Sequence, residues 1–91
     1  MLRLRGALTP ATRREYADTF SSGLEREDAW QRAVEFLFER LAVRWVIAGV
    51  LTEGQRELLM RFRVATQEER RWVRDVLREH VAAAFPELQA P

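Results

Sequence analysis

The sequence predicts an all-α fold, a small four-helix domain with one long central helix. Apolar residues recur at helical spacing in every long segment, and capping signals stand where helices would start. No segment combines alternating polarity with β-branched enrichment as an exposed strand does. The connections are short, so neighbouring helices are expected to be antiparallel. The 91 residues suit a single domain, with loose tails expected at residues 1–7 and 87–91.

The first expected helix starts with a clear signal. Thr9 is placed as its N-cap, and Pro10 takes the first helical position, where a missing N–H has no consequence. Tyr16 and Phe20 follow at helical spacing. The small residues at 21–23 predict its end.

The second expected helix is the central one and covers about 25–48, with Gly49 as its C-terminal stop. Its first half is amphipathic, but from Ala42 onward apolar residues also occupy the side of the helix that was polar before. The run 41–51, LAVRWVIAGVL, is therefore apolar all round apart from one arginine. It is too short to span a bilayer, which needs about 20 residues. We expect it to be covered either by the other helices or by another chain.

Two capping boxes predict the remaining helices. The segments TEGQ at 52–55 and TQEE at 66–69 match the pattern in which a threonine and a later Glu or Gln cap each other's backbone. They are expected to start a third helix, about 53–65, and a fourth, about 67–84. Pro86 ends the fourth helix.

Composition excludes several classes of site. There is no cysteine, so neither a disulfide nor a thiolate metal site is possible, and a lone histidine cannot build a histidine cluster. No metal and no cofactor are expected.

All 15 basic residues are arginine, which indicates GC-rich bacterial coding, and the net charge is +1. The N-terminus lacks the apolar core of a secretory signal, so a cytoplasmic location is expected, with no membrane partner.

The function predicted from this pattern is that of a non-catalytic protein–protein interaction module, either a homodimer or an accessory subunit of a bacterial complex. Two crossing central helices would bring the closed apolar half into a symmetric interface. Val46→Glu is expected to disrupt such an assembly. The expected contact residues are Phe38, Val43, Trp45, Val46 and Ile47 on the second helix, with Trp72 and His80 on the fourth.

Three polar side chains lie within the apolar arcs of the expected helices. Arg40 and Arg44 are expected to pack their stems and extend their charged ends to an acidic partner such as Glu15 or Asp18. The alternative is an anion site, with the two arginines one turn apart binding a carboxylate or phosphate. His80 is expected to be a hydrogen-bonded core or interface residue, with a pH-sensitive interface as the alternative.

Two alternative functions follow from the same side chains. A stripe of arginines on the fourth helix suits the phosphates of a nucleic acid, although acidic residues share its exposed side. The other alternative is a small enzyme with a pocket formed by Arg40, Arg44 and His80. The short loops and the absence of a known catalytic motif argue against it. The arginines of the stripe are Arg70, Arg71, Arg74 and Arg78.

The run GVLTEGQRELLMRF at 49–62 is similar to a helical stretch of the nitrile hydratase β-subunit family. The similarity covers a minor part of the chain. In that family the metal-ligand cysteines lie on the partner subunit, so the resemblance implies an accessory role.

Overall fold

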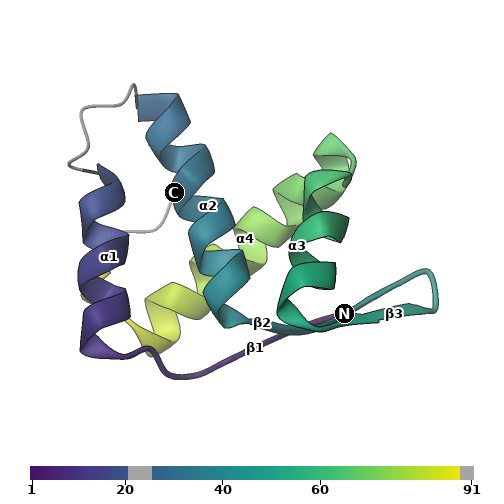
Figure 1. The fold of residues 1–91 in the computed structure, drawn as a ribbon, viewed down its shortest axis with the longest axis horizontal. Helices are drawn as coiled ribbons and strands as arrows, with labels where there is room; N and C mark the ends of the chain where they lie inside the picture. Colours follow the sequence, from purple (N-terminus) through teal and green to yellow (C-terminus); the bar gives the residue numbers. More distant parts are fainter. Residues whose placement is uncertain (21–25, 89–91) are drawn as a thin grey trace.

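The computed structural model describes residues 1–20 and 26–88 and contains four helices and a three-stranded antiparallel sheet within these ranges. The all-α prediction is therefore wrong, and the fold is α+β, not a helical bundle (Figure 1). In chain order the elements are β1 (Leu2–Leu4), α1 (Pro10–Phe20), α2 (Arg26–Leu41), β2 (Ala42–Ile47), β3 (Val50–Glu53), α3 (Gln55–Arg63) and α4 (Gln67–Ala84).

The expected central helix, about 25–48, ends at Leu41, and the chain continues directly into β2. As a helix, the run after Leu41 would be apolar on all sides and would need cover on all sides. As a strand, it divides its side chains between two faces, so that Trp45 is buried while Val46 lies on the opposite face. β-Branched and aromatic residues favour this conformation.

A two-residue turn connects β2 to β3. Ala48 and Gly49 have φ values of 47° and 79°, and Ile47 pairs with Val50 across them. Two successive positive φ values are typical of a type I′ turn, whose twist matches that of antiparallel strands. Gly49 is therefore a hairpin residue and not the C-terminal stop of a helix.

The N-terminal segment, expected to be a loose tail, contains strand β1. Leu2 pairs with Trp45 and Leu4 with Ala42, so β1 extends the sheet on the side of β2 opposite to β3. At the other end, Leu88 packs against the core, whereas residues 89–91 lie outside the described part of the chain.

Two of the predicted helix starts are confirmed. The backbone N–H of Thr12 donates to Thr9 Oγ1 at 3.1 Å, and α1 begins at Pro10. Thr66 and Glu69 form the predicted reciprocal capping box, and α4 has the predicted range.

The capping box predicted at 52–55 is wrong. Thr52 lies in β3, and α3 begins after Gly54, which has φ 89° and no side-chain cap. The helix is accordingly shorter than the predicted 53–65. The predicted end of the first helix at 21–23 lies outside the described residues.

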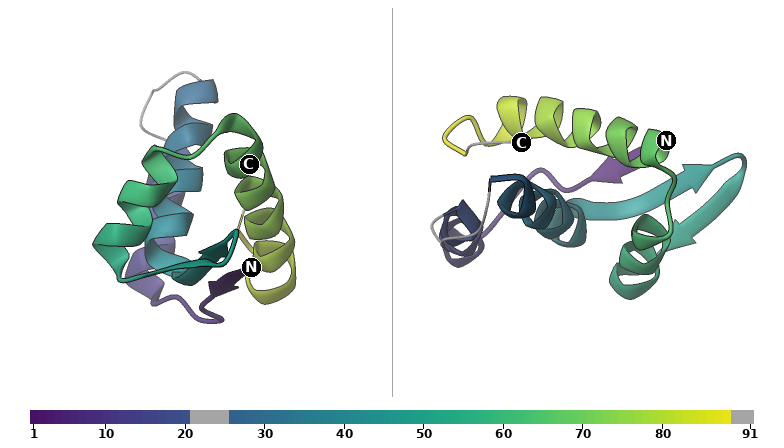
Figure 2. Two further views of the ribbon diagram at one scale, coloured as in Figure 1. Left: turned by 90° about the vertical axis from the view of Figure 1, so that its right-hand side faces the viewer. Right: turned by 90° about the horizontal axis from the view of Figure 1, so that it is seen from above.

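The core lies between the sheet and the helices, with α4 along one side and α1, α2 and α3 across from it (Figure 2). Phe38 of α2 is at its centre. Its ring stacks on Phe62 of α3 at 4.7 Å between centroids and contacts the edge of Trp45 at 5.5 Å. Burial raises the pKa of Tyr16 to about 12, so this phenol stays neutral as a core residue does. Val73, Leu77 and Val81 supply the core face of α4.

Candidate functional site

Strand β3 is an edge of the sheet, and its backbone geometry determines which groups face outward. Ile47 and Val50 close the two-residue hairpin as a hydrogen-bonded pair, and bonded and non-bonded pairs alternate along antiparallel strands. Leu51 opposes Val46 as a non-bonded pair, so its N–H and C=O point away from β2. The bond from Val46 N–H to the Met1 carbonyl (2.8 Å) agrees, because it directs the polar groups of Val46 toward β1.

Large apolar side chains are exposed around this hairpin. The exposed fractions are 70% for Met1, 66% for Val50, 50% for Leu51 and 44% for Trp72. We name these four residues, together with the half-buried Val46, the hairpin patch. Residues 45–52 contain no charged side chain, and the tip of the hairpin projects beyond the helices (Figures 1 and 2). Met1, Val46 and Leu51 share one face of the sheet and Val50 lies on the other, so apolar side chains are exposed on both faces of the hairpin. Exposed apolar surface of this kind is typical of a binding site.

A groove of about 340 Å³ runs between the hairpin and the start of α4. Met1, Val46 and Trp72 line it, so the hairpin patch continues from the sheet onto the helix. Glu69 lies at the same groove. The Thr66 backbone N–H and then the Arg61 guanidinium, at 2.7 Å, lower the pKa of this carboxyl group.

The Arg61 guanidinium also lies 5.4 Å from the centroid of the Trp45 ring, where a cation–π contact is favourable. Arg61 therefore connects the capping box of α4 to the buried side of β2. The charged rim of the groove is thereby fixed in place next to the hairpin patch.

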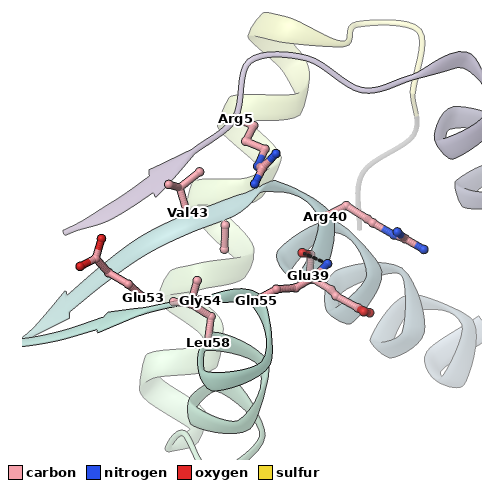
Figure 3. A pocket seen from close by; sticks show the side chains of 9 residues that line it. Arg5, Glu39, Arg40, Val43, Glu53, Gly54, Gln55 and Leu58 are labelled. Carbon is pink, nitrogen blue, oxygen red and sulfur yellow. Dashed lines mark hydrogen bonds between the residues drawn. The ribbon is translucent and has the colours of Figure 1, made fainter.

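A second depression, of about 460 Å³, lies beside α2, β2 and the start of α3 (Figure 3). Its lining mixes opposite charges, because it includes both Arg5 and Glu53, while Arg40 extends away from Gly54. Gln55 Nε2 donates to the Glu39 backbone carbonyl at 3.2 Å. This mixture of charges does not favour a ligand of either sign.

The two arginines of the predicted anion site are separated by the change from helix to strand. Arg40, in α2, pairs with Glu15 at 3.5 Å, and Arg44, in β2, pairs with Glu53 at 3.1 Å. The pairing of Arg40 with Glu15 is the one expected from the sequence. Arg3 lies directly opposite Arg44 on β1, and Glu53 on the other side offsets this like-charge contact.

His80 is half-buried on α4, and its Nε2 lies 2.6 Å from the backbone carbonyl oxygen of Arg5. Its ring contacts Phe85 edge to face at 6.0 Å. These contacts match the expected hydrogen-bonded histidine and attach α4 to the segment after β1. Neither of the two depressions described above joins Arg40, Arg44 and His80: Arg40 lines one, and the other two residues line neither.

The arginine stripe of α4 is partly engaged within the chain. The Arg70 guanidinium donates to the Arg63 carbonyl and lies 5.7 Å from the Phe62 ring centroid. Arg74 is half-buried, whereas Arg71 and Arg78 are exposed. The four residues do not therefore present an equal row of charges to a phosphate backbone.

The predicted contact residues divide into two groups. Phe38 and Trp45 are core residues, exposed by 0% and 2%. Trp72 is exposed, and the half-buried members of the predicted set are Val43, Val46, Ile47 and His80. The predicted set omitted Val50 and Leu51, the most exposed part of the hairpin. The signal that could have identified them is VIAGVL, in which two β-branched or apolar segments flank a two-residue turn ending in glycine.

The described residues contain no group of three metal-ligating side chains that could hold an ion. Within the same part of the chain, no helix has the length and apolarity needed to cross a bilayer. Comparison of the chain with family models, with curated proteins and with solved structures found no match. The similarity of residues 49–62 to the nitrile hydratase β-subunit family therefore has no support from these comparisons.

Proposed function

We propose that the chain is a protein-binding module and that the hairpin patch is its contact surface. One observation supports this most strongly: the end of the hairpin, which has no charged side chain over residues 45–52, projects from the molecule with Val50 and Leu51 exposed by 66% and 50%. The centres of protein interfaces are depleted in charged residues and enriched in aromatic residues and methionine. Trp72 and Met1 supply these side chains at the adjoining groove.

The alternative functions have weaker support from the geometry. An enzyme would need its polar groups gathered at one cavity, and the groups expected for one lie apart. A nucleic-acid surface would need a continuous basic face, and Arg70 and Arg61 are turned toward their own chain. The hairpin patch itself contains no basic residue.

Site-specific photo-cross-linking in the cell that encodes the chain tests this proposal. A benzophenone amino acid replaces Leu51, and the matched control replaces Val64, which is apolar and 75% exposed at the far end of α3. We expect a discrete cross-linked protein species from position 51 and none at that mass from position 64. Equal products from both positions, or none from position 51, would contradict the proposal.

A further inference from the structure

We infer that β3 pairs with β3 of a second copy of the chain, antiparallel about a two-fold axis at Leu51, and that two three-stranded sheets thus become one of six strands. The inference rests on the proposed function, because it names the partner of the hairpin patch. Its first support is the difference between the two edges of the sheet.

The edge formed by β1 carries the features that prevent strand addition. It is three residues long, has Arg3 on it and Arg5 directly after it, and its register with β2 shifts between Arg3 and Leu4. Short length, charge and bulges are the features that protect natural sheet edges. The edge formed by β3 is only one residue longer, but it lacks the other two features along Val50, Leu51 and Thr52, where there is no charge, proline or shift of register. In the part of the chain that the structure describes, no strand pairs with this side of β3.

The outward-facing backbone groups limit the possible two-fold registers. Leu51 and Glu53 direct their N–H and C=O groups to the edge, so these residues must form the bonded pairs. An axis at Glu53 would place two carboxylates directly opposite each other, which is destabilising. An axis at Thr52 would place Leu51 opposite a carboxylate. An axis at Leu51 avoids both, because Glu53 then faces Gly49 of the second copy.

The axis at Leu51 also gives matched side-chain rows. On the outer face, one row of apolar side chains crosses the axis. It consists of Met1, Val46 and Leu51 of one copy, followed by the same three residues of the second copy in reverse order. On the inner face, Val50 faces Thr52 of the second copy. The segment 49–53 is therefore complementary to itself when reversed, which favours a second copy over an unrelated strand. Figure 2 shows the hairpin extending past the helices. Leu51 is exposed by 50% and α3 begins only at Gln55, so a second strand can approach this edge.

Disulfide trapping tests this register, because the chain has no cysteine and a single introduced one can cross-link only two copies. In Leu51→Cys the two-fold would place the two Cα atoms about 5.5 Å apart, within the range that a disulfide requires. Val50→Cys and Thr52→Cys are the register controls, and Val64→Cys is the control for an exposed position outside the patch. In a glutathione buffer we expect Leu51→Cys to cross-link at least about tenfold faster than the three controls, since pairing raises the effective concentration of the two thiols. A rate equal to that of Val64→Cys, or a faster rate at position 50 or 52, would overturn the inference.

Light scattering at two concentrations tenfold apart tests the same inference without a covalent bond. We expect a mass near twice 10.7 kDa for the parent chain and 10.7 kDa for Leu51→Glu, whose two carboxylates would meet at the axis. Val64→Glu is the matched control and should keep the double mass, with circular dichroism verifying that both variants are folded. A monomeric parent, an open-ended assembly, or loss of mass in both variants would refute the pairing. A monomer whose position 51 still photo-cross-links to a different protein would refute the pairing but leave the proposed function intact.

Discussion

The two halves of the apolar run LAVRWVIAGVL differ in what covers them. Leu41, Ala42 and Trp45, in the first half, are exposed by 6% or less, whereas Val50 and Leu51, in the second, are exposed by half or more. Apart from Arg44, both halves consist of apolar residues and glycine, so apolarity alone does not predict which half is covered. The difference arises from the change to a strand after Leu41 and from the turn that returns the chain along the sheet edge. An apolar sequence indicates that a segment is more stable when its side chains are buried. The topology of the fold determines whether residues of the same chain bury them.

Truncation in each half should give the largest contrast. Trp45→Ala is expected to lower the free energy of unfolding by about 3–5 kcal/mol, because it leaves a cavity against Phe38 and Arg61. Leu51→Ala should lower it by less than about 1 kcal/mol, as is usual for partly exposed sites. Urea denaturation at a protein concentration low enough to exclude self-association provides the measurement. Similar losses in both variants would contradict the division into a covered and an uncovered half.

The sequence predicted the helices whose signals are local. The start of α1 at Pro10 and the whole of α4 follow from hydrogen bonds between near neighbours, which a sequence pattern can identify. The capping box predicted at 52–55 failed for a non-local reason. Thr52 lies in a strand that exists only because β2 pairs with it.

Strand β2 was missed because its register imitates a helix. Leu4 pairs with Ala42 while Arg3 pairs with Arg44, so Val43 is an extra residue in β2. Such a bulge places the buried residues Ala42 and Trp45 on one face although they are three apart in sequence. Spacing by three is the signature of a helix, and the period of two was hidden.

The candidate site could be predicted only in part for the same reason. Val46 and Trp72 were expected at a contact surface and lie in the hairpin patch. Val50 and Leu51 were passed over because Gly49 was interpreted as the end of a helix. Their exposure depends on the sheet order, which no local pattern encodes.

Substitutions in the turn between the halves should have smaller effects, of opposite sign. Gly49→Ala is expected to destabilise the chain by about 1–2 kcal/mol, because a Cβ is disfavoured at φ 79° although the space around it is open. Ala48→Asn should stabilise it by about 0.5 kcal/mol, since asparagine tolerates the positive φ of a type I′ turn. In a helix extending to residue 48, asparagine would instead be less favourable than alanine. The sign of the change in urea midpoint for Ala48→Asn therefore distinguishes the hairpin from the helix.

The smallest expected effect concerns pH and the covered half alone. The Thr66 backbone N–H and Arg61 hold the pKa of Glu69 below its usual value of 4.5, so the folded state takes up this proton less readily than the unfolded state. The resulting stability is present above about pH 4.5 and is lost as the pH falls through the lowered pKa. Since Arg61 also contacts Trp45, protonation of Glu69 should loosen the covered half and leave the hairpin tip unaffected.

Glu69→Gln is expected to flatten the acid side of the Tm–pH profile relative to the parent chain. The control is Glu79→Gln, which removes a carboxylate on the exposed side of the same helix without affecting the capping box. Parallel profiles for the parent and Glu69→Gln would show that the charge of Glu69 does not stabilise the covered half.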